Sequence, residues 1–280
     1  VSSQIEVCAL VEQREELNIM GFVKANFTNR YVFDALIDEP IIHGIFTREG
    51  GVSPEPWNSL NLGGLNGDTR ENVVENRRRI FDDINRDVRS VFDVWQVHSC
   101  DVICSNQARP LDEMHKKADA ILTDNPEITL MMRFADCVPL LFFDPVARVV
   151  GIAHAGWQGT VKNIAGATVD AMEENYQSKP SNIIVGIGPS IGADHYEVGE
   201  DVVQQVRIAL RNDIHGAVID RDGHTYLDLW EVNRRLLHNS GIQYVYNANI
   251  CTACDTTRWY SHRAEKGKTG RFGAVIALKE

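Results

Sequence analysis

The residues of this sequence best suited to chemistry are a cysteine and a histidine that flank a predicted β-hairpin. Two apolar runs, Val138–Phe143 and Val149–Ala153, are separated by Asp144 and a proline, which favour a turn. Cys137 directly precedes the first run, and His154 directly follows the second. Because two adjacent antiparallel strands would carry both side chains to the same edge of a sheet, we expect the thiol and the imidazole to face each other.

A second histidine, His98, follows another predicted strand, Val91–Val97. One cysteine with two histidines is a recognised ligand set for zinc, and it leaves a fourth position for water or substrate. Zinc in such a site lowers the pKa of bound water to about 7. The sequence therefore predicts that His98, Cys137 and His154 are metal ligands, while three ordinary core residues remain the alternative.

Cys137 and His154 also suit a thiol nucleophile and its base. This second interpretation needs a third group that orients the imidazole. Asp136 is adjacent in sequence, but neighbouring residues of a strand point to opposite faces of the sheet. A cysteine hydrolase therefore stays open as an alternative, and it gives His98 no role.

Four further motifs carry weaker signals. Arg48 ends the predicted strand Ile41–Arg48 beside Glu49 and two glycines, which suits anion recognition but also describes a solvated turn. Gly156–Thr160 leads into a predicted helix, where backbone amides favour anions. The Cys-Thr-Ala-Cys motif at 251–254 is half a zinc site, a redox pair or two buried thiols. Without a second such motif we favour structural thiols. We expect the basic cluster at 257–271, formed by residues 257–263 and 269–271, to be a solvated face, with the edge of a pocket as the alternative.

Composition narrows the functional class. The net charge of −11 argues against a general nucleic-acid surface. No run of about 18 apolar residues suggests a membrane span, and the first residues lack the pattern of a signal peptide. Six cysteines in 280 residues are too sparse for a disulfide scaffold. We expect a cytoplasmic protein that binds neither nucleic acid nor membrane.

The pattern of apolar residues predicts an α/β or α+β fold, in which helices layer a mixed sheet. Residues 1–40 are expected to add peripheral strands to the domain formed by residues 41–280. The expected helices span 68–85, with Asp68 as the cap, 161–172, Gly199–Leu210 and Leu229–Asn239. Besides those named above, the expected strands span Ala120–Leu122, Ile128–Met132, Ile183–Ile187 and Phe272–Leu278.

The sequence resembles the YfiH-like or laccase-domain family. The resemblance rests, in chain order, on GIFTREGGVS, SLNLG, QVHS, ADAILTD, ADCVPLLFFDP, GIAHAGWQGT, IGPSIGADHYEVG, CTAC and YSHR…KTGR, and it runs from about Ile41 to Leu278. Members of this family were once called multicopper polyphenol oxidases and are now regarded as zinc-dependent purine nucleoside phosphorylases.

The resemblance implies a single-domain α/β/β/α sandwich, related in core geometry to a toxin deamidase. It implies one zinc ion on His98, Cys137 and His154, and a purine nucleoside and phosphate as substrates. The implied nucleosides are adenosine, inosine, guanosine and methylthioadenosine, with possible deamination of adenosine. The expected catalytic residues are Cys137 and Asp136, and in deamination a carboxylate such as Asp136 would move protons. The substrate-binding residues that we expect are Arg48, Asn61, Gly156 and Trp157, in a monomer or homodimer.

Two alternatives to the phosphorylase follow from the same residues. A copper-dependent polyphenol oxidase would resemble multicopper oxidases in paired His-x-His motifs, yet none of the nine histidines lies two residues from another. The cysteine hydrolase would act on peptidoglycan precursors and would use Cys137 with His154.

Overall fold

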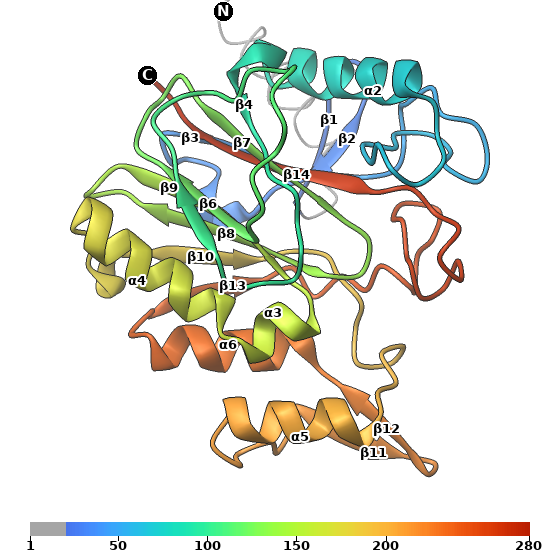
Figure 1. The fold of residues 1–280 in the computed structure, drawn as a ribbon, viewed down its shortest axis with the longest axis vertical. Helices are drawn as coiled ribbons and strands as arrows, with labels where there is room; N and C mark the ends of the chain where they lie inside the picture. The colour runs from blue at the N-terminus through green and yellow to red at the C-terminus, as the bar shows by residue number, and fades with distance from the viewer. Residues whose placement is uncertain (1–20) are drawn as a thin grey trace, which may run out of the picture.

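The computed structural model describes residues 21–280, in which two six-stranded sheets lie face to face between helices (Figure 1). The first sheet runs in the order β1 (Phe22–Lys24), β2 (Asn29–Tyr31), β3 (Ile41–Phe46), β14 (Phe272–Leu278), β7 (Thr129–Phe134) and β4 (Val91–Phe92). The second runs in the order β13 (Tyr244–Asn247), β10 (Ile184–Ile187), β8 (Val138–Asp144), β9 (Val149–Ala155), β6 (Ala120–Thr123) and β5 (Val102–Cys104).

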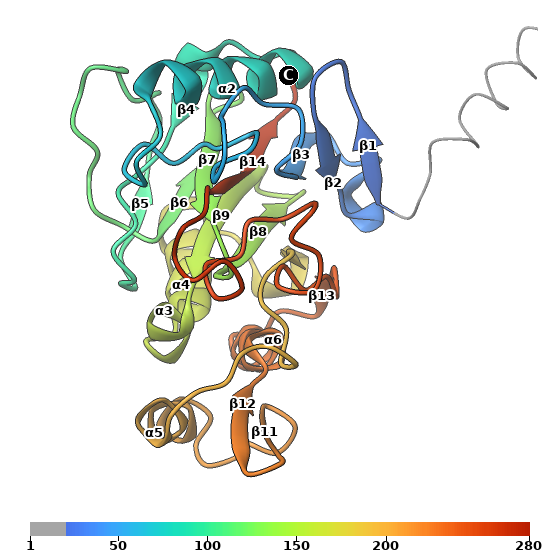
Figure 2. The same cartoon turned by 90° about the vertical axis from the view of Figure 1, so that its right-hand side faces the viewer.

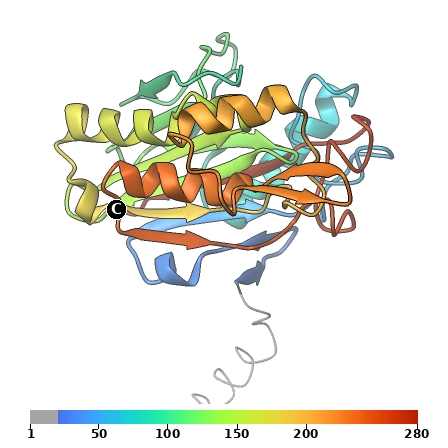
Figure 3. The same ribbon diagram turned by 90° about the horizontal axis from the view of Figure 1, so that it is seen from below.

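Helices cover the outer face of each sheet, as the side view in Figure 2 shows. One long helix, α2 (Arg70–Asp83), lies on the first sheet, whereas the others lie on the side of the second sheet: α3 (Trp157–Val161), α4 (Ile164–Tyr176), α5 (Glu200–Ala209) and α6 (Leu229–Asn239). Seen from below, α5 and α6 lie between α4 and the small hairpin of β11 (Val218–Arg221) and β12 (His224–Leu227) (Figure 3). Short 3-10 helices span Asp34–Leu36, Val88–Ser90 and Pro180–Asn182.

The alternation of side chains along β8 explains the layers. Leu140 and Phe142 are buried against the helices that cover the second sheet. Leu141 and Phe143 point the other way, into the core between the two sheets. Because successive strand residues face opposite sides, one continuous apolar run serves both cores. The predicted α/β/β/α sandwich is confirmed.

The central hairpin is also confirmed. β8 and β9 pair antiparallel from Val138 opposite Ala155 to Asp144 opposite Val149. Asp144 accepts hydrogen bonds from the two backbone amides after Pro145, which closes the turn. The register brings the start of β8 beside the end of β9, where Cys137 and His154 lie.

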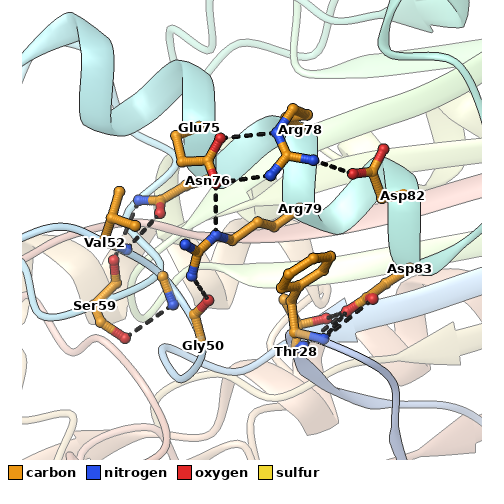
Figure 4. Close-up of polar contacts among 12 residues, drawn as sticks. Thr28, Gly50, Val52, Ser59, Glu75, Asn76, Arg78, Arg79, Asp82 and Asp83 are labelled. Carbon is orange, nitrogen blue, oxygen red and sulfur yellow. Dashed lines mark hydrogen bonds and ion pairs between the residues drawn. The ribbon is translucent and has the colours of Figure 1, made fainter.

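Helix α2 begins one residue later than predicted. Thr69, not Asp68, caps it by accepting a hydrogen bond from the backbone amide of Asn72. The helix also fixes the loop before it (Figure 4). The buried Asn76 side chain accepts from the backbone of Val52, and Arg79 donates to the carbonyl of Gly50 at 2.8 Å. These contacts hold the glycine-rich loop against α2.

Two other predicted elements differ from the structure. The helix expected over 161–172 is divided between α3 and α4 because Asn163 adopts a left-handed conformation, with φ of 63°, and caps α4. The strand expected over Val91–Val97 is only two residues long. After it, the Gln96 side chain bonds both the amide and the carbonyl of Arg133, in place of strand pairing.

The peripheral strands predicted in residues 1–40 are present as β1 and β2 at one edge of the first sheet, and the part of that prediction that concerns residues 1–20 lies outside the described residues. None of the helices described has the length and apolar character needed to cross a bilayer. The grouping of all residues in one domain stays a prediction.

Candidate metal centre and its pocket

The three predicted ligands meet at one edge of the second sheet, and we call His98, Cys137 and His154 the central cluster. Their ligand atoms all lie within 4.8 Å of one another. The Cys137 Sγ atom is 3.9 Å from Nε2 of His98, and the rings of the two histidines meet edge to face with centroids 4.9 Å apart. The two ends of one hairpin and a loop 39 residues before Cys137 thus present one sulfur and two imidazoles to a common point.

A glycine keeps this point open. Gly156 precedes α3, and a Cβ atom there would lie 2.8 Å from Cys137 Sγ and 2.9 Å from a ring carbon of His98. Real Cβ atoms do not approach other atoms so closely. Any side chain at this position would displace the cluster, so glycine is required by contact rather than by backbone conformation.

One carboxylate, Asp119, orients the ring of His154 and holds the turn that carries His98. It is fully buried, and its Oδ1 atom lies 2.9 Å from Nδ1 of His154. Its other oxygen accepts hydrogen bonds from the backbone amides of Val97 and Ser99, which flank His98. Carboxylates that bind the far nitrogen of a metal-ligating histidine fix its ring and raise its basicity. Sequence reasoning missed Asp119, whose only signal was its place before β6.

The backbone on either side of the cluster is unusual. His98 has a φ of 59° and Asp136 a φ of 80°, both in the region that side chains other than glycine rarely occupy. Such strain persists only where surrounding contacts hold it. At His98 those contacts come from Asp119, and at Asp136 from Thr252 and Arg263, described below.

Electrostatics favour the metal-binding form of the thiol. Burial opposes ionisation of Cys137, but the charge of His154 and hydrogen bonds from both histidines lower the pKa of the thiol to about 6. Burial likewise opposes the charge on His154, whereas Cys137 and Asp119 raise the pKa of its imidazole to about 9. Thiolate is the form of cysteine that binds metal and attacks carbon. The lowered pKa of Cys137 therefore supports both the metal site and the cysteine nucleophile.

A pocket of about 740 Å³ opens over the central cluster. Its walls carry flat aromatic side chains and several guanidinium groups. They are Trp95, Trp157, Tyr196, Arg77, Arg133, Arg263 and Arg271. Such a mixture suits a ligand with an aromatic ring and an anionic group. The basic cluster at 257–271, predicted to be a solvated face, thus contributes two arginines to the pocket.

The arginines at one end of the pocket exceed the carboxylates that balance them. Asp93, fully buried, lies 3.5 Å from Arg77, 2.8 Å from Arg109 and 3.4 Å from Arg133. The Nε atom of Arg77 is buried and finds no hydrogen-bond partner among residues 21–280. Burial, with the charge of Arg133, lowers the pKa of Arg77 to about 10, which leaves it charged at neutral pH. This end of the pocket therefore has an excess of positive charge.

The structure does not bring Arg48 to this pocket. Its guanidinium donates to the carbonyls of Asn58 and Thr256, both at 2.7 Å, and pairs with Glu265 at 3.0 Å. It also lies over the ring of Tyr260. Arg48 lines a separate surface depression, where these contacts hold loops together, and its predicted contact with substrate stays a prediction.

The remaining predicted residues lie at or behind the pocket wall. Trp157 lines the pocket, and together with Gly156 it also lines a smaller cavity of about 130 Å³ beside Cys137. Asn61 is fully buried behind the wall, where its Oδ1 atom accepts from the amides of Gly63 and Arg271.

Asp136 lines the pocket, but both oxygens of its carboxylate are engaged. One accepts from Thr252 Oγ1 at 2.7 Å and the other from the amide of Arg263 at 2.6 Å.

Comparison with known proteins decides the family. Residues 42–279 match the family described as multi-copper polyphenol oxidoreductase laccase. This chain belongs to that family. Among the YfiH-like relatives, the purine nucleoside phosphorylase YlmD of Bacillus subtilis is 38% identical over 251 residues, which cover 87% of this chain and 90% of the relative. The purine nucleoside phosphorylase YfiH of Escherichia coli is 34% identical over 232 residues, which cover 83% and 91%.

Solved structures of the YfiH-like family have the same fold. The structure of YlmD from Geobacillus stearothermophilus matches with a TM-score of 0.86 at 34% identity, over 92% of this chain and 98% of that one. The hypothetical protein YfiH of Bacillus licheniformis matches with the same TM-score at 33% identity, over 93% of this chain and all of that one.

The central cluster fits a metal ion. Tetrahedral zinc with one thiolate and one imidazole holds their ligand atoms about 3.6 Å apart, close to the 3.9 Å between Cys137 and His98. Asp119 supplies the outer hydrogen bond that metal-binding histidines require, and the pocket leaves one side of the cluster open to substrate.

Proposed function

We propose that this protein is a zinc-dependent purine nucleoside phosphorylase. The observation that carries the proposal is that the central cluster and the arginines share one pocket. The relatives named above support it, because both are named purine nucleoside phosphorylases and the match to this chain covers 90% and 91% of their lengths. Adenosine, inosine, guanosine and methylthioadenosine share a purine ring and a ribose-type sugar, and the pocket volume suits this class.

The walls of the pocket suggest how the two substrates bind. Trp157 and Tyr196 offer aromatic faces close to Cys137, where a purine can stack. Phosphate needs positive groups, and Arg271 lies near enough to Cys137 for the thiolate charge to act on its pKa. Burial lowers the pKa of the Arg271 guanidinium, and the charges of Cys137 and Asp136 oppose that shift. We therefore assign phosphate binding to Arg271, with Arg77 and Arg133 further along the same wall.

In phosphorolysis, a phosphate oxygen bonds to the anomeric carbon of ribose as the bond from that carbon to the purine nitrogen breaks. The electron pair of the broken bond leaves with the purine, and the sugar becomes ribose-1-phosphate. Arg271 would hold the phosphate in line with this carbon, while Trp157 and Tyr196 exclude water from the ring. Zinc held by the central cluster would supply a Lewis acid beside the reacting groups.

Asp136 takes a positioning role in this proposal. Deamination of adenosine would need a carboxylate that exchanges protons with the substrate. Because hydrogen bonds from Thr252 and Arg263 occupy both oxygens of Asp136, we propose that it holds the backbone before Cys137. Deamination is then the minor activity.

One observation favours a second candidate, the cysteine hydrolase. Asp119 is the orienting group for His154 that this mechanism needs, so Cys137, His154 and Asp119 form a nucleophile, base and orienter. The amide and ester bonds of peptidoglycan precursors would be its substrates. His98 separates the candidates, because it completes a metal site but serves no purpose in the hydrolase.

The test is to incubate the reduced protein, purified without chelator, with each nucleoside in the presence and absence of phosphate. If the protein is a phosphorylase, free purine and ribose-1-phosphate should form only when phosphate is present. Activity that survives chelation but is abolished by thiol alkylation would favour the hydrolase. If micromolar enzyme converts none of the nucleosides, the proposal of phosphorylase activity is wrong. We place the protein in the cytosol, because both candidates need Cys137 reduced.

A further inference from the structure

A second group of metal-ligating side chains lies outside the pocket, and we call His195, Cys251 and Cys254 the loop cluster. His195 lies on the loop that follows β10, and the two cysteines lie on the loop that follows β13. β10 and β13 are neighbouring parallel strands, so their final residues end at the same edge of the sheet. The pairing continues into the loops, where Ser190 bridges to Cys251.

The geometry of the loop cluster is that of a zinc site. Nδ1 of His195 is 3.7 Å from Cys251 Sγ and 3.6 Å from Cys254 Sγ, and all three ligand atoms lie within 4.8 Å of one another. Zinc–sulfur and zinc–nitrogen bonds at a tetrahedral angle place the two ligand atoms about 3.6 Å apart. One imidazole nitrogen carries at most one hydrogen for two sulfurs, whereas a cation at the centre satisfies all three groups.

The surroundings support a thiolate at Cys251. The backbone amide of Gly192 donates a hydrogen bond to Cys251 Sγ at 3.2 Å. A Cβ atom at Gly192 would lie 3.2 Å from Cys251 Cβ and 3.3 Å from its sulfur, so the close approach of this amide depends on the glycine. Amides that donate to sulfur stabilise the charged form, which is the form that binds metal.

We propose that His195, Cys251 and Cys254 bind a second zinc ion, which fastens the loops after β10 and β13 together. Cys251 is half-buried, and His195 and Cys254 are exposed, so water completes the fourth position from the solvent side. The motif at 251–254, expected to be two buried structural thiols, is thus two ligands whose third partner is 56 residues away from Cys251.

The two loops that carry the loop cluster also contact the wall of the pocket. Ile191, on the first loop, donates its amide to the carbonyl of Asp136 at 3.0 Å, and Thr252, on the second, donates its hydroxyl to the Asp136 carboxylate. Tyr196, next to His195, lines the pocket itself. A metal ion in the loop cluster would therefore support the strained backbone beside Cys137 without touching substrate.

The experiment counts zinc in protein purified under reducing conditions without chelator. Wild type is expected to hold two zinc ions per chain, and the Cys251→Ser/Cys254→Ser double variant one. Cys137→Ser is also expected to hold one, and the matched control Cys100→Ser, which alters an exposed thiol outside both clusters, should keep two. Equal zinc in wild type and the double variant would overturn the proposal.

A measurement on the unmutated protein covers the case in which the double variant does not fold. Thiols are labelled with a maleimide before and after chelation, and the labelled positions are read by mass spectrometry. Cys100 is expected to react at once, and Cys254, although exposed, only after the metal is removed. Labelling of Cys254 at the same rate with and without chelator, or a disulfide between Cys251 and Cys254, would show that no metal is held there.

Discussion

The central cluster and the loop cluster use the same kinds of ligand in opposite settings. The central cluster lies at the end of a fully buried hairpin, with Asp119 behind it and an open pocket before it. The loop cluster lies on two surface loops, and the structure gives its histidine no carboxylate partner within residues 21–280. A metal site becomes a candidate for catalysis when a rigid scaffold and a substrate pocket accompany the ligands. A metal site that only fastens two loops together, as proposed for the loop cluster, needs no more than its ligands.

The largest difference between the clusters should appear in activity after a single thiol is removed. Cys137→Ala deletes a ligand at the reacting centre, where a metal contributes several kcal/mol to the transition state, so phosphorolysis should fall below about one-thousandth of wild type. Cys254→Ala removes only a support, and we expect about a tenfold loss at most. Steady-state kinetics with inosine and phosphate measure both. Equal losses of activity in the two variants would remove the distinction between a catalytic central cluster and a structural loop cluster.

The carboxylate behind the central cluster gives the next largest effect. Asp119→Asn keeps the size of the side chain but loses the charge that holds the ring of His154 and the turn that carries His98. Outer hydrogen bonds of this kind are worth about 10–100-fold in metal affinity or activity. Competitive titration with a zinc chelator measures the affinity, and Asp101→Asn, an exposed neighbour, is the control. Unchanged zinc affinity in Asp119→Asn would mean that the Asp119 charge is not needed to position His154 and His98.

Substitution of Arg271, which lines the pocket, should affect a different property from substitution of Arg48, which holds loops together. Arg271→Gln should raise the KM for phosphate about tenfold, because a hydrogen bond to a charged group is worth about 1.5–3 kcal/mol. Arg48→Gln should leave that KM near the wild-type value and lower the free energy of unfolding by about 2–4 kcal/mol, since it breaks a buried ion pair and two bonds to carbonyls. Kinetics and urea unfolding separate the two. A rise in the phosphate KM in Arg48→Gln would restore its predicted substrate role.

The smallest effect is a difference in thiol reactivity after metal removal. In chelated protein the pKa of Cys137 is lowered to about 6, because its two histidines outweigh burial. Burial and the neighbouring thiol Cys251 raise the pKa of Cys254 to about 11. Since only the thiolate reacts, alkylation of Cys137 should reach half its maximal rate near pH 6, and that of Cys254 should still be rising above pH 9. Parallel pH profiles for the two thiols would contradict this assignment.

The sequence revealed the central cluster because each ligand borders an apolar run of the right length. The hairpin, the register of its two ends and the layers of the sandwich follow from alternating burial in β8 and β9. The sequence did not reveal Asp119, because its contact with His154 depends on how β6 pairs with β9, where Ala120 lies opposite Ala153. Such a register is a property of the folded sheet and has no local signature.

Loop residues were harder to place for a related reason. Arg48 and Arg271 are both arginines close to a strand end and a glycine, yet one is enclosed by Asn58, Thr256 and Glu265 and the other reaches the pocket. His195 joins Cys251 and Cys254 only because β10 and β13 lie side by side. In each case long-range packing decides which residues meet.

The most direct test of the proposed metal centre is phosphorolysis of inosine by protein that has been stripped of metal and then reloaded with zinc. Stripped protein is expected to release no hypoxanthine, and zinc is expected to restore release in wild type but not in Cys137→Ala. Ribose-1-phosphate should form in equal amount, and only when phosphate is present. Full phosphorolysis by the stripped protein, or none by the reloaded protein, would contradict the assignment of His98, Cys137 and His154 as the metal centre of a nucleoside phosphorylase.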